Sequence, residues 1–273
     1  MSGGHHKVVL ISGASSGIGL ACAGHLARRG YRVFGTSRGT QHAGEVPFEM
    51  IQMDVDDEAS VRSGVDLILK KAGRLDVVVN NAGFGIAGSV EDTSIEEARA
   101  QFETNFFGVL RICRAVLPTM RAQGSGLIVN VGSIGGLIGL PYQGLYSAAK
   151  FALEGLTEAL RIEVRPFGVH VVMLEPGDTR TGFTGRRRKA AAAQGQSVYA
   201  EGFRRALAVI ESDEGNGVSP MVSARVLERI ITSRSPRLHY RAGAFAQVLI
   251  ALLKPVLPAR LCQWIIASHY HVR

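Results

Sequence analysis

Tyr146 and Lys150 lie four positions apart, which is the spacing of neighbours on one face of an α-helix. The phenol of a free tyrosine has a pKa of about 10, too high for an acid or base at neutral pH. A nearby ammonium stabilises the phenolate and lowers that pKa. The pair is therefore a candidate for proton transfer, although the same spacing is common on ordinary solvated helix faces.

Two more polar residues are candidates for the same centre. Ser133 ends the apolar run Leu127–Ser133, which predicts a buried strand, and Asn105 lies in a long helical pattern before it. The carboxyl ends of parallel strands form the ligand-binding edge of such a sheet. Ser133 is therefore expected at that edge.

A glycine-rich turn follows the first apolar run of the chain. Residues 12–19 read SGASSGIG, which is a G-x-x-x-G-x-G spacing. Glycines here let the backbone approach a pyrophosphate bound at the N-terminus of the next helix. The spacing differs from G-x-G-x-x-G and lacks the Lys-Ser/Thr of a P-loop. The alternative is a simple tight turn.

The end of the second predicted strand bears on the kind of dinucleotide. A fold that selects NAD usually places an acidic residue there for the ribose 2′-hydroxyl. This chain has Ser37 followed by Arg38. A guanidinium suits a 2′-phosphate, and no carboxylate repels it. We therefore predict a preference for NADP(H) over NAD(H), with a solvated surface arginine as the alternative.

The elements that must position these residues alternate along the chain. Short apolar runs predict strands, and patterns with helical periodicity separate them. Such alternation predicts an α/β fold with a doubly wound parallel sheet of Rossmann type, helices on both faces and a C-terminal apolar helical extension. The predicted strands are 7–12, 31–37, 49–54, 75–80, 127–133 and 169–175, and the helices 18–29, 56–72, 94–121 and 141–165.

The chain shows no internal repeat, so we expect one domain over residues 1–273, with a core at 7–181. Residues 182–273 are expected to form a substrate lid and the extension. Within 177–217 a loop-and-helix segment carries the basic run 186–189. A helix at 218–233, a short strand at 237–240 and helical pieces to about residue 268 follow.

These motifs together resemble the short-chain dehydrogenase/reductase family, in its branch of roughly 250 residues and near its hydroxysteroid and retinol dehydrogenases. The resemblance covers about residues 7–181. In order, it includes the turn Gly13–Gly19, the segment Asn80–Gly83 (NNAG), Asn105, Ser133, the Tyr-x-x-x-Lys pair, and Pro176-Gly177 with Thr181. Each motif is weak alone, but their shared order is specific.

The resemblance implies a role for each matching residue. Tyr146 is the general acid in reduction and the base in oxidation, and Lys150 lowers its pKa and binds the nicotinamide ribose. Ser133 donates to the substrate oxygen, and Asn105 holds a water of a proton relay. Asn80 lines the adenosine side of the site. Expected cofactor contacts are Gly13, Ser15, Ser16, Gly17, Ile18, Gly19, Ser37, Arg38, Asp54, Val55, Asn81, Ala82, Gly83, Tyr146, Lys150, Pro176, Gly177, Thr179 and Thr181.

Two positions depart from the family pattern. Ser12 stands where threonine is common, and the hydroxyl is kept. Thr179 stands where the family usually has an aliphatic residue. Because family contacts to the carboxamide there use largely backbone atoms, we expect the contact to survive.

The substrate is expected to be a small carbonyl compound or alcohol of lipophilic character. The segments after residue 176 supply Phe183, Tyr199, Phe203 and Val209 and an apolar tail, which would suit a steroid, a retinoid or another lipid. The same residues could simply pack the domain or a subunit interface. The alternatives are a ketoacyl-thioester reductase, which shares the catalytic residues but usually ends sooner, and a non-enzymatic NADP(H) sensor.

Composition narrows the remaining possibilities. The net charge of +8 comes without zinc-finger spacing or an RNA-binding strand pattern, so we expect no nucleic-acid partner. The three scattered cysteines and the short polar stretch 1–7 favour a cytoplasmic protein without a signal peptide. The low charged content favours a homodimer or homotetramer. The histidines, His5, His6, His239, His269 and His271, show no metal-ligand spacing, so no metal is expected.

No run is long enough for a membrane span. The tail 244–268 is expected to pack as a pocket lid, with peripheral contact with a membrane surface as the alternative. For the arginines 186–188 the expectation is a solvated mobile loop, with an anionic substrate as the alternative.

Overall fold

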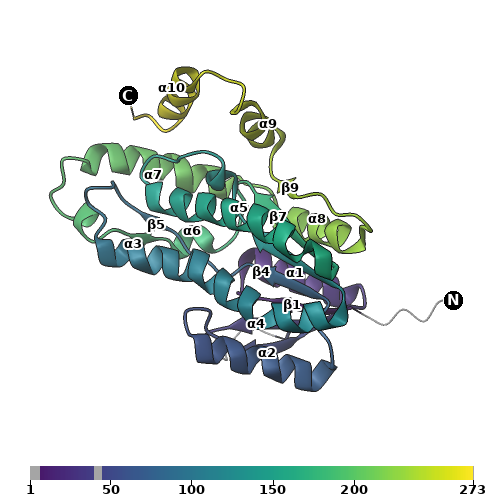
Figure 1. Cartoon of the computed structure of the whole chain (residues 1–273). Helices are drawn as coiled ribbons and strands as arrows, with labels where there is room; N and C mark the ends of the chain where they lie inside the picture. Colours follow the sequence, from purple (N-terminus) through teal and green to yellow (C-terminus); the bar gives the residue numbers. More distant parts are fainter. Residues whose placement is uncertain (1–6, 40–44, 273) are drawn as a thin grey trace.

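A computed structural model describes residues 7–39 and 45–272 of the chain. Its centre is a seven-stranded sheet in the order β3-β2-β1-β4-β6-β7-β9, in which every neighbouring pair is parallel (Figure 1). The chain starts at β1 in the middle, so the order reverses between β1 and β4. This confirms the predicted doubly wound sheet. The strands are β1 Val8–Ile11, β2 Arg32–Ser37, β3 Glu49–Gln52, β4 Val77–Asn80, β6 Gly126–Val131, β7 Val169–Pro176 and β9 His239–Ala242.

Helices cover both faces of this sheet. Helices α1 (Gly17–Arg28) and α8 (Met221–Thr232) pack on one face. Helices α2 (Glu58–Ala72), α4 (Gly108–Gln123) and α5 (Gly144–Val164) pack on the other. The central strand β4 is therefore buried at all four positions, which explains why its first three residues are all valine.

The predicted helix from residue 94 to 121 is divided in three. Ser94 and Glu97 form the expected capping box at the start of α3 (Ile95–Phe102). The next five residues, Glu103–Phe107, form a π-helical turn before α4 begins. Such turns widen the backbone and place Asn105 out of the regular helical register. The sequence pattern did not predict this interruption.

The helix expected from residue 141 begins only at Gly144. Tyr142 has a φ of 58°, in the left-handed region, so the helix cannot extend back through it. A short 3-10 turn, Ile134–Gly136, lies between β6 and this helix.

The structure contains short elements that the sequence pattern missed. The two-residue strands β5 (Ile86–Ala87) and β8 (Arg188–Lys189) pair with each other. The strand expected at 237–240 is β9, which runs two residues later. The remaining elements are the helices α6 Phe183–Arg186, α7 Ala200–Gly215, α9 Phe245–Leu253 and α10 Ala259–His269 and the 3-10 turns Arg165–Phe167 and Ala192–Gln194.

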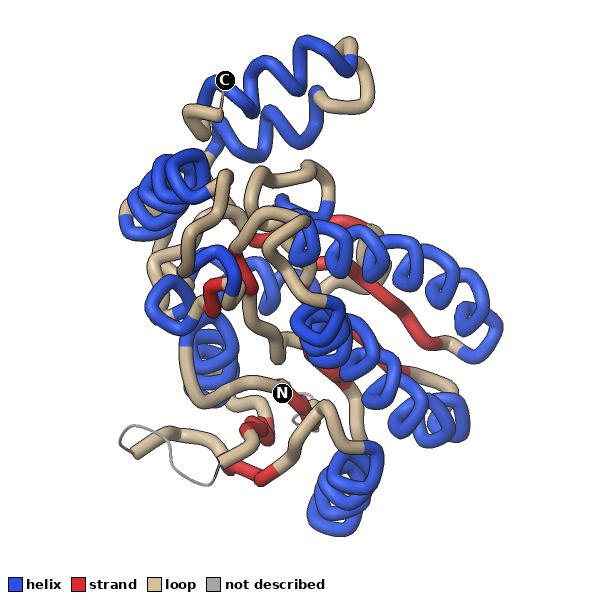
Figure 2. The backbone as a smooth tube through the Cα atoms, turned by 90° about the vertical axis from the view of Figure 1, so that its left-hand side faces the viewer, coloured by secondary structure: helices blue, strands red, loops and turns tan. Residues whose placement is uncertain are grey.

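Helices α9 and α10 form a hairpin that stands apart from the layered body (Figures 1 and 2). Across residues 7–39 and 45–272 no helix is long and apolar enough to cross a membrane. His5 and His6, for which no metal role was expected, lie outside the described residues.

Candidate active site

A cleft of about 350 Å³ lies at the carboxyl ends of the central strands. It is lined by all four expected catalytic residues, which come from the π-helical turn, α5 and the segment just after β6, where Ser133 lies two residues beyond the strand end. It is also lined by every expected cofactor residue except Gly19. The sequence motifs, spread over about 170 positions, therefore meet at one place.

The glycine turn has little room for side chains. Gly13 has a φ of 66°, and a Cβ there would lie 2.8 Å from the Cα of Ala82. A Cβ on Gly19 would lie 2.4 Å from the carbonyl oxygen of Gly13, so Gly19 supports the turn from behind. The N-cap residue of α1, Ser16, makes no side-chain cap, which leaves the first N–H groups of the helix open to an anion. These features fit a dinucleotide pyrophosphate.

Ser12 joins this turn to the segment after β4. Its hydroxyl oxygen accepts hydrogen bonds from the backbone N–H groups of Asn81 (2.9 Å) and Ala82 (3.0 Å). In return, Nδ2 of Asn81 donates to the carbonyl oxygen of Ser12 (2.9 Å). A hydroxyl at position 12 is thus used structurally, and serine in place of threonine preserves it.

Asn80 does not line the cleft, contrary to the expectation from the family. Its side chain points into the interior on the face covered by α4 and α5, where it is buried and donates to Oδ1 of Asn130 at 2.8 Å. Asn130 in turn donates to the hydroxyl of Thr157 at 2.8 Å. Asn80 is therefore part of a buried polar chain that connects β4, β6 and α5.

One end of the cleft carries Arg38, directly after β2. Arg38 is exposed and lines the cleft, and no carboxylate elsewhere in residues 7–39 and 45–272 forms an ion pair with it. The hydroxyl of Ser37 donates to the carbonyl oxygen of Gly39. Asp54 Oδ1 accepts from the N–H of Asp56 at 3.1 Å. A free guanidinium at this end fits a phosphate group.

Tyr146 and Ser133 face each other at the other end of the cleft. The N–H of Gly135 donates to Oγ of Ser133 at 3.0 Å, which holds the serine in place. The ring of Tyr146 packs against Phe183 with 6.1 Å between centroids. Burial raises the pKa of Tyr146, and its hydrogen bond with Ser133 opposes that shift.

Lys150 is buried one turn after Tyr146. Its Nζ donates to the carbonyl oxygen of Val131 at 2.8 Å and lies 6.0 Å from the centre of the Tyr146 ring. Burial lowers the pKa of Lys150 to about 8. The sequence led us to expect a lowered pKa for Tyr146. In the structure the net shift is upward, because desolvation of the phenol outweighs the effects that favour the phenolate.

Asn105 is fixed by the loop that follows β4. Its Oδ1 accepts from the N–H of Phe84 at 3.1 Å, and its Nδ2 donates to the carbonyl oxygen of the same residue at 2.9 Å. A Cβ on Gly83 would lie 3.1 Å from that Oδ1. The amide keeps one hydrogen and one lone pair for a further partner, such as the expected water.

A charged group near Tyr146 was missed by sequence reasoning. Asp178 and Glu214 line the cleft, and the Arg187 side chain, only 2% exposed, forms an ion pair with Glu214. Burial and then the nearby Asp213 carboxylate raise the pKa of Asp178 to about 6. The expected solvated loop is therefore wrong for Arg187. Nothing local signals this group, because its members are far apart in the sequence.

Of the four apolar and aromatic residues expected in the pocket, Phe183 lines the cleft. Phe203 is buried in a small core with β5. The Tyr199 hydroxyl donates a hydrogen bond to the Glu91 carboxylate at 2.7 Å near the surface. Val209 faces a separate shallow depression beside Ser212 and His271. Of these three residues, Phe203 packs the domain, and Tyr199 and Val209 lie outside the cleft.

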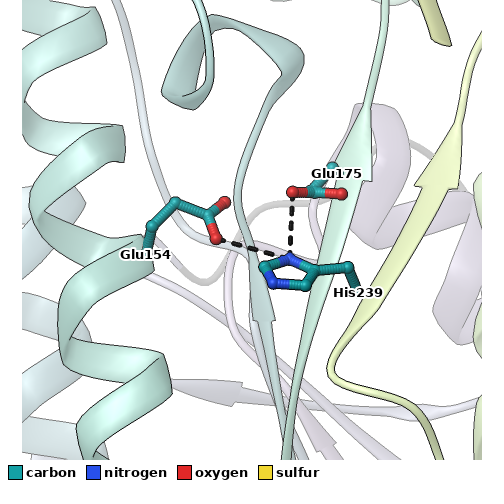
Figure 3. A group of neighbouring side chains, drawn as sticks. All are labelled: Glu154, Glu175 and His239. Atoms are coloured by element: carbon teal, nitrogen blue, oxygen red, sulfur yellow. Dashed lines mark hydrogen bonds and ion pairs between the residues drawn. The ribbon is translucent and has the colours of Figure 1, made fainter. Parts of the chain in front are cut away.

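A second cluster of titratable side chains, Glu154, Glu175 and His239, begins one helical turn after Lys150 (Figure 3). His239 Nδ1 is 3.2 Å from Glu175 and 3.6 Å from Glu154, and Arg241 Nε is 3.2 Å from Glu175. Burial, followed by the Glu175 carboxylate, raises the pKa of Glu154 to about 8. The spacing of the histidines in the sequence did not predict this cluster. One ring nitrogen of His239 and one carboxylate oxygen each of Glu154 and Glu175 lie within 4.8 Å of one another. Arg241, together with His239 when protonated, supplies positive charge to the two carboxylates.

Comparison with known proteins places the chain in a family. The family model described as short chain dehydrogenase matches residues 7–192. A 3-ketodihydrosphingosine reductase from Bacteroides thetaiotaomicron is 42% identical over 268 residues, which cover 98% of this chain and 99% of the relative. Retinol dehydrogenase 8 from Bos taurus is 37% identical over 265 residues, with coverages of 90% and 84%.

Structural comparison agrees. A short-chain dehydrogenase from Streptomyces avermitilis superposes with a TM-score of 0.81 at 35% identity, covering 97% of this chain and 98% of the other. The chain therefore belongs to the short-chain dehydrogenase/reductase family and is an oxidoreductase that acts between CH–OH groups and carbonyls with a nicotinamide cofactor.

Proposed function

We propose that the protein is an NADP(H)-dependent oxidoreductase that interconverts a lipophilic ketone or aldehyde and its alcohol, with Tyr146 as the general acid and base. One observation carries this proposal. The hydroxyls of Tyr146 and Ser133 meet in the same cleft as the open N-terminus of α1, with Lys150 buried beside them.

The cofactor would lie along the cleft between its two ends. The glycine turn and the N-terminus of α1 would hold the pyrophosphate, and Arg38 with Ser37 would hold the 2′-phosphate. Asp54 would lie at the adenine, and Thr179 and Thr181 near the nicotinamide. When bound, the cofactor supplies the hydride. A backbone bridge to Val218 fixes the position of Thr179 in the cleft.

The chain's own residues handle the proton and the developing charge. The raised pKa of Tyr146 keeps its phenol protonated at neutral pH, ready to donate to a carbonyl oxygen. Ser133 Oγ, which already accepts from Gly135, keeps its own proton to donate to the same oxygen. Lys150 is held by Val131 and would resupply the proton, with Asn105 toward the solvent side.

For the substrate we favour a long-chain ketone of the kind reduced by the relative named 3-ketodihydrosphingosine reductase. The similarity to that relative spans nearly the full length of both chains, including the region after β7. A retinoid or a steroid is the second candidate, supported by the similarity to retinol dehydrogenase 8. A simple ketoacyl-thioester reductase shares the catalytic residues but would leave the α9–α10 extension without a role.

We also expect a homodimer or homotetramer in the cytoplasm. Two large apolar side chains, Ile95 on α3 and Phe107 on the π-helical turn, are 63% and 42% exposed. They lie twelve positions apart in the sequence and are available to a subunit interface. Light scattering coupled to size-exclusion chromatography measures the assembly directly.

The test combines a substrate panel with one matched pair of variants. Wild type should reduce 3-ketodihydrosphingosine faster than retinal, estrone or acetoacetyl thioesters, and NADPH should serve better than NADH. Tyr146→Phe should lose about 10²–10⁴-fold in kcat yet bind NADPH normally. The control Tyr199→Phe, which removes a phenol hydroxyl outside the cleft, should keep full activity. NADPH binding without turnover of any compound would support a sensor instead.

A further inference from the structure

The α9–α10 hairpin presents an apolar outer surface. Eight of the seventeen large hydrophobic side chains that are exposed in the described chain lie within residues 245–264. In α9 only Ala251 is buried, and α10, all of which is described, buries no residue. The eight are Phe245, Leu249, Ile250, Leu252, Leu253, Val256, Leu261 and Trp264.

The inner side of the hairpin is tied to the body beside the cleft. Gln247 Oε1 accepts from the N–H of Asp178 at 3.1 Å, and its Nε2 donates to the Asp178 carboxylate. Lys254 donates to the carbonyl oxygen of Leu137, just after the turn that follows Ser133. His269 pairs with Asp213 at 2.7 Å. These polar contacts tie the hairpin to the body, from which its two helices stand apart (Figure 2), and leave the eight apolar side chains exposed.

The charge of this region has one sign. No aspartate or glutamate follows Glu228 in the sequence, and the hairpin carries Lys254 and Arg260 as its charged residues. Because Lys254 is bonded to the body, Arg260 is the exposed charge beside the apolar surface. An apolar surface with a basic residue and no acidic one matches the boundary between lipid headgroups and acyl chains of an anionic bilayer. A second copy of the hairpin would offer these cations no acidic partner, because it carries no aspartate or glutamate of its own.

We propose that the α9–α10 hairpin docks the protein on the surface of an anionic lipid bilayer. The exposed apolar side chains enter the headgroup region, and Arg260 lies at the lipid phosphates. The proposal does not depend on the proposed function. If both hold, a lipophilic substrate dissolved in the bilayer would reach the cleft beside Asp178.

The chain contains its own reporter of this contact. Trp264, 58% exposed on α10, is its sole tryptophan. Vesicles of phosphatidylcholine with about 30% phosphatidylglycerol mimic an anionic leaflet. Adding them should shift the fluorescence emission of Trp264 to the blue. The protein should also sediment with these vesicles. Pure phosphatidylcholine should bind at least about tenfold more weakly, and salt should weaken binding to the anionic vesicles.

A matched pair of variants tests the surface itself. Val256, between α9 and α10, and Ile162, on α5, are branched aliphatic residues with exposures of 76% and 75%. Val256→Glu should lower partitioning onto anionic vesicles by roughly tenfold or more, because one large apolar side chain no longer leaves water and a charge is added. Ile162→Glu makes the same change of charge and should leave partitioning unchanged.

Three results would overturn the proposal. The first is no binding to anionic vesicles, and the second is equal binding to neutral ones. The third is a blue shift that grows with protein concentration without lipid, together with a change of oligomeric state in Val256→Glu, which would assign the hairpin to a second copy. NADPH oxidation by the same samples is measured separately, so a failure of the enzymatic proposal is distinguishable from a failure of docking.

Discussion

Replacing Arg38 with alanine tests how the protein distinguishes NADPH from NADH. The guanidinium stands at the open adenosine end of the cleft and forms no ion pair with any carboxylate in the described part of the chain. Its hydrogen bonds are therefore free for a 2′-phosphate. The protein loses little by the substitution itself, because the side chain is exposed and holds no other element in place.

The size of the effect follows from this position. Hydrogen bonds to a charged group contribute about 1.5–3 kcal/mol, which corresponds to roughly 10- to 150-fold in affinity. Exposure to solvent places Arg38 toward the lower end of that range. The substitution also removes a positive charge near Asp56, which lines the cleft, so the site becomes less favourable for a phosphate. We expect about tenfold weaker NADPH binding in Arg38→Ala and NADH binding within twofold of wild type.

Fluorescence titration of both cofactors measures these affinities without any substrate. The loss for NADPH should shrink as salt is raised, because the contact is exposed. Arg234→Ala, which removes an exposed arginine from the loop before β9, is the control and should change neither affinity. An unchanged ratio of NADPH to NADH affinity in Arg38→Ala would refute the assignment of the 2′-phosphate to this residue.

Three further substitutions test separate parts of the site. Gly19→Ala should weaken NADPH and NADH binding alike and lower stability by roughly 1–3 kcal/mol, because its Cβ would lie 2.4 Å from the Gly13 carbonyl oxygen; unaltered calorimetric binding would contradict this. Ser133→Ala should lower kcat about 10²–10³-fold with NADPH affinity kept, and a change in affinity alone would argue against a role at the substrate oxygen. The pKa of Glu154 rises from 4.5 to about 8 on folding, so its carboxyl makes wild type less stable as pH rises through that window. Glu154→Gln cannot ionise, and its Tm should gain on wild type from pH 5 to pH 8, whereas Glu163→Gln, exposed near the end of α5, should track wild type.

The sheet and the cofactor end of the cleft were predictable from sequence because their signals are local. The run Val77–Val79 is apolar at each of its buried positions, and the glycines of residues 13–19 are required by the turn that contains them. The capping box at Ser94 depends on two residues three apart. Each pattern can be recognised without knowing which distant segments pack against it.

The features that were missed depend on distant partners. The π-helical turn places Asn105 against the backbone of Phe84, 21 residues earlier, and no periodicity in the helix itself records that contact. Glu154 and Glu175 come together with His239 only after β9 has joined the sheet. In the sequence Arg187 belongs to a basic run that predicts a solvated loop. Its ion-pair partner, Glu214, comes from α7. Long-range pairing therefore limits prediction at the substrate end more than at the cofactor end.

Burial acts in opposite directions on the two groups that are expected to move the proton. It raises the pKa of the Tyr146 phenol and lowers the pKa of the Lys150 ammonium to about 8, and both shifts favour the uncharged forms. Reduction needs a protonated phenol, so its kcat/KM should be flat near neutral pH and fall only when the phenol ionises. Oxidation of the alcohol needs the phenolate, so its kcat/KM should rise steadily from pH 6 to pH 9. Steady-state profiles in both directions measure this asymmetry, and an oxidation rate that is independent of pH over that range would show that Tyr146 is not the base.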